Sequence, residues 1–162
     1  MQKFLKTILP LLLNRVDRTK PLETRLFNAI ARHSVTICFE AVLLRKNEQN
    51  NLEIFLAKRS ANQTYANQWH IPGSIFRALE SATDVAVRLS ELEFGAKIET
   101  FRFCEEFFYE AEYGTILDQI YLVEINEPID EKFGTWFPIN QLPTPFCEFH
   151  KNRILPILSR YI

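Results

Sequence analysis

Three charged residues that could act on a phosphate or a metal ion lie in the segment between Gly73 and Gly95. Glu80, Arg88 and Glu93 stand within it in that order. Glutamate carboxylates are the oxygen ligands that Mg²⁺ and Mn²⁺ prefer, and an arginine side chain binds phosphate oxygens through two parallel N–H groups. The segment therefore predicts a loop and a helix that together handle a phosphorylated substrate and a divalent cation.

The elements that position these residues can be read from the local sequence. Pro72-Gly73-Ser74 predicts a turn, and Ser81 is a suitable N-cap for a helix that reaches about Phe94, with Gly95 ending it. Val85, Leu89 and Leu92 have the spacing i, i+4, i+7, so we expect all three to face the core.

The flanking sequence predicts one mixed domain. Strand-like runs occupy residues 34–46, 52–59, 97–112, 115–126 and 134–142, and a closing helix covers 146–162 with an interruption at Pro156. Helical segments are expected at 1–15 and 22–32, and a loop at 60–68. We therefore expect an α/β (α+β) domain at residues 34–162, preceded by an N-terminal helical extension at residues 1–33.

Composition narrows the class of protein. The chain has 162 residues, 47% of them hydrophobic, with 14 Phe and a net charge of −1. We expect neither nucleic acid nor a membrane as a partner. The three cysteines are far apart, which favours free thiols in a reducing compartment, the cytoplasm. The apolar run at the N-terminus is short and interrupted, so we expect a helix that packs on the domain or on a second subunit.

The spacing from Ser74 to Gly95 resembles the Nudix box, G-x5-E-x7-R-E-U-x-E-E-x-G-U, where U is aliphatic. Lys58-Arg59-Ser60, residues 68–73, residues 136–142 and a later helix with His150 and Arg153 also resemble this superfamily, so the likeness covers roughly residues 34–158. The resemblance implies an α/β/α sandwich with a mixed sheet. It also implies hydrolysis of a nucleoside diphosphate linked to another group, with Mg²⁺ or Mn²⁺ as cofactor.

The box departs from the common pattern in its glutamates and in its first glycine. Leu89 and Leu92 replace two glutamates, and Ser74 replaces the first glycine. The form Arg88-Leu89-Ser90-x-x-Glu93-x-Gly95 resembles that of GDP-mannose mannosyl hydrolases, which use a single Mg²⁺. The resemblance implies a nucleotide sugar as substrate.

This subfamily resemblance also implies roles for individual residues. Glu93 and the carbonyl of Gly73 would be metal ligands, and Arg59 would contact the diphosphate. Glu80, also a candidate for the metal site, would pair with Arg88 and hold the loop against the helix.

The general base is not evident from the sequence. The loop of residues 127–135 lacks the Gln-His pair of that subfamily, which leaves Asp130 or Glu131 as replacement base or ligand. A glutamate of the long hairpin could also complete the metal site; the candidates are Glu105, Glu106, Glu110 and Glu112. Tyr65 and Trp69 could stack on a base or sugar, or pack around their loop. For His70 and His150 we favour structural roles.

Three functions remain open at this point. The first is a hydrolase of a nucleoside diphosphate derivative, and the second is a Nudix-fold module without activity that binds a nucleotide or a protein. The third is a structural role in a homodimer, formed through the apolar N-terminal helix. Retention of Glu80, Arg88 and Glu93 in phase favours a function that involves a ligand.

Overall fold

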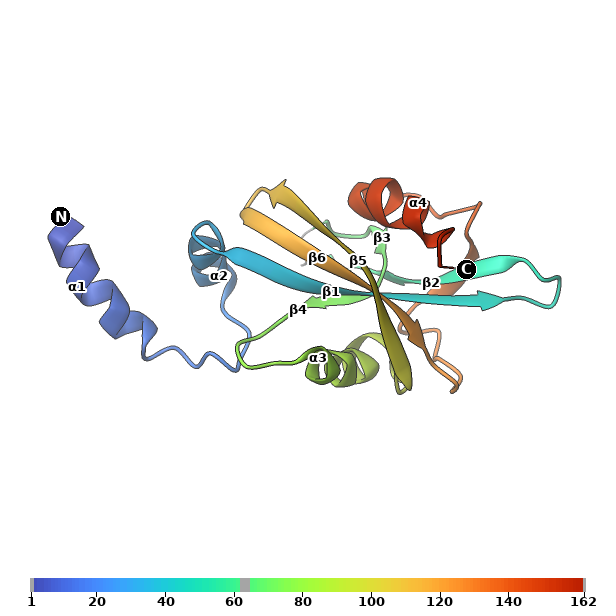
Figure 1. Ribbon diagram of the computed structural model, residues 1–162, viewed down its shortest axis with the longest axis horizontal. Helices are drawn as coiled ribbons and strands as arrows, with labels where there is room; N and C mark the ends of the chain where they lie inside the picture. Colours follow the sequence, from blue (N-terminus) through green and yellow to red (C-terminus); the bar gives the residue numbers. More distant parts are fainter. Residues whose placement is uncertain (1, 62–64, 162) are drawn as a thin grey trace.

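The structure is a computed structural model that describes residues 2–61 and 65–161 (Figure 1). Its elements follow the order α1 (Gln2–Leu13), α2 (Thr24–Ala31), β1 (Val35–Lys46), β2 (Leu52–Lys58), β3 (Trp69–His70), β4 (Gly73–Ile75), α3 (Ala82–Leu89), η1 (Ser90–Phe94), β5 (Thr100–Ala111), β6 (Gly114–Glu124), β7 (Thr135–Pro138), η2 (His150–Ile154) and α4 (Leu155–Leu158). The predicted loop at 60–68 lies partly outside the described residues.

The strands form one mixed sheet. Its order is β3-β2-β1-β6-β5, with β4 added to β1 and β7 added to β2. Strands β1 and β6 are parallel and aligned from Val35–Thr115 to Leu43–Val123, whereas the other pairs are antiparallel. The predicted α+β class with a mixed sheet is confirmed.

Helices cover both faces of the sheet, with α3 on one side and α4 on the other (Figure 1). Side chains alternate between the two faces of β1. Phe39, Ala41 and Leu43 pack with Val85 and Leu89 of α3, whereas Val42 packs with residues of η2 and α4. Cys38 and Glu40 stand four and two residues before Val42 on the same strand. Their side chains therefore lie on the same face of the sheet as Val42, the face covered by α4.

The helix after the box loop departs from the prediction at its end. Regular α-helix stops at Leu89, and η1 continues as a π-helical turn that is closed by a bond from the Gly95 N–H to the Ser90 carbonyl. The wider turn shifts the phase of the following side chains, so Phe94 is buried in the core while Leu92 is 61% exposed. The expectation that Leu92 faces the core is wrong, whereas Val85 and Leu89 are buried as predicted.

The two N-terminal helices differ in their contacts. In α2, Ala31 is buried and Phe27 packs against Tyr113 at the turn between β5 and β6, with ring centroids 5.6 Å apart. Helix α1 lies apart from the sheet, and Phe4, Leu9, Leu11 and Leu12 are exposed (Figure 1). Among the described residues, no helix combines the length and apolarity that crossing a membrane requires. The domain boundary after residue 33 stays a prediction.

The closing helix is shorter than expected. The π-helical turn η2 passes into α4 at Leu155, one residue before Pro156. Proline is accepted in the first turn of a helix because the N–H that it lacks would have no partner there. The change in helix type therefore precedes the proline.

Candidate active site

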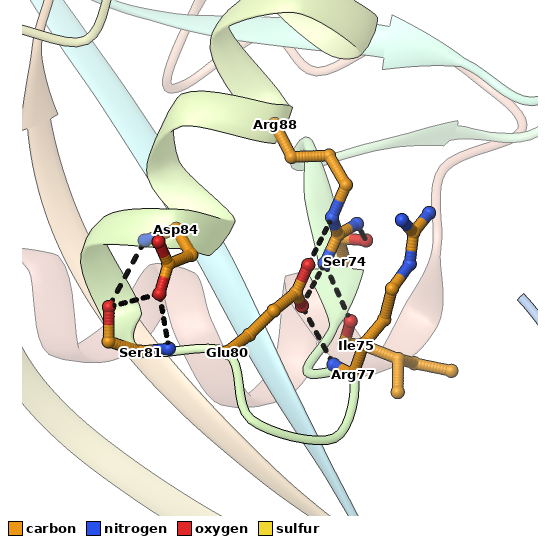
Figure 2. Close-up of polar contacts among 7 residues, drawn as sticks. All are labelled: Ser74, Ile75, Arg77, Glu80, Ser81, Asp84 and Arg88. Carbon is orange, nitrogen blue, oxygen red and sulfur yellow. Dashed lines mark hydrogen bonds and ion pairs between the residues drawn. The ribbon is translucent and has the colours of Figure 1, made fainter. Parts of the chain in front are cut away.

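Glu80 and Arg88 form the predicted pair, and together they hold the box loop against α3 (Figure 2). Glu80 Oε1 accepts from Arg88 Nε at 2.9 Å, and Glu80 Oε2 accepts from Arg88 Nη2 at 2.7 Å and from the Arg77 N–H at 2.7 Å. Arg88 also donates to the Ser74 hydroxyl and to the Ile75 carbonyl, the latter at 3.0 Å. We call this network of Ser74, Ile75, Arg77, Glu80 and Arg88 the clasp.

These contacts settle which carboxylate pairs with Arg88 and what role Glu80 has. Asp84, the other possible partner of Arg88, instead completes a capping box with Ser81, in which its carboxylate accepts from the Ser81 N–H at 2.8 Å. Both oxygens of Glu80 are engaged, and Arg88 holds the pKa of this carboxyl below its usual range. A metal role for Glu80 would require breaking these bonds, so we assign it to the clasp alone.

Ser90 connects the end of α3 to the next segment of chain. Its hydroxyl donates to the Ala86 carbonyl at 2.8 Å and accepts from the Ile98 N–H at 2.9 Å. The serine within the Arg-Leu-Ser form of the box therefore fixes the path of the chain after η1.

Glu93 is the box carboxylate that takes no part in the clasp. It is half-buried on η1, where burial raises the pKa of its carboxyl and the nearby positive charge of Arg59 offsets part of that shift. Arg59 follows β2, and its Nε atom is buried without a hydrogen-bond partner. The structure thus brings the predicted metal ligand and the predicted diphosphate ligand into electrostatic contact.

Gly73 lies opposite Glu40 on the neighbouring strand β1. A Cβ atom on Gly73 would come within 2.5 Å of Glu40 Oε2 and 2.8 Å of the Phe39 carbonyl, so only glycine fits here. The close approach places a buried carboxylate directly beside the backbone that is predicted to ligate the cation. Sequence reasoning missed Glu40 because it lies inside an apolar strand.

The predicted base loop lies against the end of η1. Gly95 has a φ of 61°, and a Cβ atom there would overlap the ring of Phe133, which shows how closely this loop packs. Asp130 turns back into its own loop, accepting from the Lys132 N–H at 2.9 Å and pairing with Lys132 Nζ at 3.2 Å. Glu131 is exposed, and its role as base stays a prediction.

Three of the hairpin glutamates have side-chain partners, and Glu106 accepts from the Gln119 side-chain amide at 3.5 Å. Glu105 pairs with Arg160 at 3.2 Å, and Glu110 accepts from the Thr115 hydroxyl at 2.8 Å. Of the two aromatic candidates, Trp69 packs against Phe137 with ring centroids 4.9 Å apart, whereas Tyr65 is exposed. Stacking of either ring on a substrate stays a prediction.

Cys38, Glu40 and Asp118 form a second polar group, which we call the buried cluster. Asp118 on β6 is the register partner of Cys38, and each of the three residues places one oxygen or sulfur atom within 4.8 Å of the others. Both oxygens of Asp118 and the Oε2 atom of Glu40 are buried without hydrogen-bond partners. Burial raises the pKa of the Asp118 carboxyl to about 6 and that of Glu40 well above its usual range.

Two buried histidines have opposite tautomers, and one of them, His150, lies beside the buried cluster. His150 Nδ1 accepts from the Ile71 N–H at 2.9 Å, so a neutral ring carries its proton on Nε2, which is 3.5 Å from Glu40 Oε2. His70 Nδ1 donates to the Ile71 carbonyl at 2.7 Å, which leaves its Nε2 unprotonated. Burial lowers the pKa of His70 to about 4 and that of His150 well below its usual value, so both rings are neutral at pH 7.

The donors at the box fit a single cation. Leu89 is buried in the core and Leu92 is aliphatic, so Glu93 is the glutamate that α3 and η1 keep from the common cluster. Its carboxylate loses solvation on burial, and a nearby cation would offset that cost. Two or three ions would need further carboxylates at positions 89 and 92, which hold leucines.

Comparison with known proteins identifies the architecture. No family model matches the sequence, and no curated protein matches it. Solved structures do. The MutT NUDIX hydrolase from Burkholderia pseudomallei superimposes with a TM-score of 0.62 at 21% identity, over 77% of this chain and 98% of its own. This chain has the Nudix fold.

Two other solved structures show the same Nudix fold. The NUDIX domain of Shewanella oneidensis NrtR, complexed with ADP ribose, gives a TM-score of 0.62 at 16% identity, over 87% of this chain and 100% of that chain. The C. elegans Ap4A hydrolase gives 0.57 at 17% identity, over 79% and 96%. At these identities the likeness establishes the Nudix fold alone, so the activity must be argued from the site.

Proposed function

We propose that this protein hydrolyses a nucleoside diphosphate linked to another group, with one divalent cation, Mg²⁺ or Mn²⁺, as cofactor. The observation that carries the proposal is that the positive charge of Arg59 acts on the Glu93 carboxyl and lowers its pKa against the effect of burial. The carboxylate is half-buried, and the Nε atom of the half-buried Arg59 side chain is enclosed without a hydrogen-bond partner. A diphosphate bound to a cation would satisfy both groups at once.

Each residue has a defined task in this proposal. The clasp fixes the loop that carries Gly73, so the Gly73 carbonyl and Glu93 are held in place before the substrate arrives. Arg59 binds the diphosphate oxygens and orients them. The cation, held by Glu93 and the Gly73 carbonyl, would supply electrostatic stabilisation of the departing diphosphate. Asp130 or Glu131 would accept a proton from the attacking water.

The Arg88-Leu89-Ser90 form of the box favours a nucleotide sugar as the substrate. A panel of nucleoside diphosphate sugars, dinucleoside polyphosphates, ADP ribose and nucleoside triphosphates, each with Mg²⁺ or Mn²⁺, tests this assignment. We expect turnover of a sugar conjugate that depends on the added cation. Absence of turnover with every substrate would reject the enzyme, and turnover of triphosphates alone would reject the substrate class.

Substitution of Glu93 tests the cation ligand. Glu93→Gln should lower turnover by about 100-fold or more while leaving the free energy of unfolding nearly unchanged, because one ligand is lost and the side chain keeps its shape. Glu91→Gln is the matched control, since Glu91 is an exposed glutamate on the same π-helical turn. Equal activity of the two variants would reject Glu93 as the ligand.

A binding module without activity is the second candidate. Leu89 is 1% exposed and packs in the core, so the position cannot take a carboxylate without disturbing that packing. This module would bind the same nucleotides without turning them over. Calorimetry beside the activity assay separates the two candidates, because saturable binding without product supports the module.

A further inference from the structure

We propose that Cys38, Glu40 and Asp118 form a binding site for a divalent transition-metal cation between β1 and β6. Its ligands come from the sheet, whereas the cation proposed at Glu93 is held from η1 and the box loop; the two sites are neighbours, because Glu40 lies beside Gly73. The site between β1 and β6 requires no hydrolytic activity and stands whether or not the protein is an enzyme.

Strand geometry accounts for the grouping of the three side chains. Cys38 and Glu40 are two residues apart on β1 and therefore point to the same face of the sheet. Asp118 on β6 is aligned with Cys38 in the parallel ladder. The three potential ligand atoms, one from each residue, lie within 4.8 Å of one another. Ligands about 2.0–2.3 Å from a tetrahedral cation lie roughly 3.3–3.8 Å apart, so the side chains must approach one another by up to about 1–1.5 Å to close the site.

The lack of hydrogen-bond partners on the buried carboxylates favours binding of a cation. Asp118 is 1% exposed and neither of its oxygens has a hydrogen-bond partner, and Glu40 Oε2 shares this condition. The nearby Cys38 thiol and Tyr109 hydroxyl lower the pKa of the Asp118 carboxyl, but neither makes a hydrogen bond of normal geometry to it. Buried carboxylates without partners are costly, and a cation bound between them removes that cost.

The charges of the surrounding groups match a divalent ion. Two carboxylates and a thiolate supply three negative charges, and the nearby Arg59 supplies one positive charge. The balance of two negative charges is neutralised by one divalent cation. A thiolate ligand favours borderline and soft ions such as Zn²⁺ over Mg²⁺.

His150 orients Glu40 from outside the ligand set. Because the Ile71 N–H fixes the tautomer of a neutral ring, the protonated Nε2 faces Glu40 Oε2 at 3.5 Å. A ring in this tautomer donates toward the carboxylate and does not ligate the metal itself. Such outer contacts hold ligating carboxylates in place. Cys38 and Glu40 each keep 8% exposure, through which an ion can enter.

Cobalt titration tests the site directly. Co²⁺ added to the chelator-treated full chain should bind at one equivalent and give the near-ultraviolet charge-transfer absorption of a cobalt–thiolate bond. Zn²⁺ should displace it, whereas a large excess of Mg²⁺ should not. Cys38→Ser should abolish the absorption, and Asp118→Asn should weaken Co²⁺ binding by about 10-fold or more. Absence of the absorption in the folded wild-type chain would overturn the proposal.

Three matched controls assign the signal to this site. Cys147→Ser removes another buried thiol and Cys104→Ser a half-buried one, and both variants should keep the absorption. Glu93→Gln should keep it too, which separates this site from the proposed hydrolytic cation. Circular dichroism checks that each variant is folded; Cys38→Ala replaces Cys38→Ser if the serine variant is not. Loss of the signal in Cys147→Ser but not in the Cys38 variant would refute the assignment.

Discussion

The clasp and the buried cluster are both polar and both enclosed, yet they differ in how their carboxylates are satisfied. Each oxygen of Glu80 accepts hydrogen bonds from Arg88, and one of them also accepts from the Arg77 N–H. In the cluster, Asp118 has no hydrogen-bond partner on either oxygen. The pKa of Glu80 is accordingly lowered, whereas the pKa of Asp118 is raised.

This difference separates structural carboxylates from carboxylates that are available to a ligand. A fully paired carboxylate stabilises the fold in its charged form, and removing its partner exposes the cost of burying it. An unpaired one destabilises the fold when charged and gains from any cation that binds it. The two regions should therefore respond to neutral substitutions with opposite signs.

The largest effect is expected from breaking the clasp. Arg88→Met should lower the free energy of unfolding by about 3 kcal/mol, because Glu80 then stays largely enclosed without its partner. Urea denaturation at pH 7 measures the loss. Lys97→Met is the control: Lys97 pairs with Glu99 at the same 2.7 Å but is 69% exposed, so its loss should stay below about 1 kcal/mol. Similar losses in both variants would show that the clasp is not a special contact.

Acidification should lower the free energy of unfolding by nearly as much, through protonation of His70. Its pKa in the folded state is about 4, below the usual value of 6.5, so the unfolded chain binds the proton first as the pH falls. The contribution of His70 is therefore complete above pH 6.5 and is lost on the way down to pH 4. Between pH 7 and pH 4.5, the wild type should lose about 2–3 kcal/mol more stability than His70→Asn. The exposed His33→Asn variant should follow the wild type, and parallel curves for all three proteins would contradict the prediction.

A neutral substitution in the buried cluster should stabilise the protein. The pKa of Asp118 is raised from 3.8 to about 6, so its favourable contribution exists at acid pH and is lost as the pH rises through 6. In chelator at pH 8, Asp118→Asn should raise the free energy of unfolding by about 1–2 kcal/mol. Asp84→Asn, which weakens a satisfied capping box, should lower it by about 1 kcal/mol. Equal signs for the two variants would remove the contrast between paired and unpaired carboxylates.

The smallest effect is expected on the box side. Leu92→Glu places a carboxylate where the common Nudix pattern has one, and Leu92 is 61% exposed. The free energy of unfolding should change by no more than about 0.5 kcal/mol, as is usual at exposed positions. Thermal unfolding measures this change. A loss above about 2 kcal/mol would mean that Leu92 packs against another surface in solution.

Much of the fold could be predicted from local sequence. Alternating and β-branched runs located β1, β2, β5 and β6, and Ser81 located the start of α3. The end of that helix could not be predicted, because a π-helical turn is selected by the burial of Phe94 and not by local propensity. Leu92 was therefore assigned to the wrong face.

The clasp could be predicted in part from the sequence, whereas the buried cluster could not. The resemblance to the Nudix box implied the pairing of Glu80 with Arg88, and the structure confirms that pair. The sequence predicted only free thiols for the cysteines, and Glu40 and Asp118 received no role. Each stands alone inside an apolar run, and β1 and β6 are distant in the sequence.

The sequence by itself determined the fold class and the box loop, since these depend on short-range spacing and on alternation of apolar residues, and its resemblance to the Nudix box implied the pair of Glu80 and Arg88. The tertiary structure alone decided which carboxylates are satisfied. Whether Asp118 has a partner depends on the register of two parallel strands and on what covers them. Solvation and charge pairing are properties of that three-dimensional arrangement, and no local pattern in the chain encodes them.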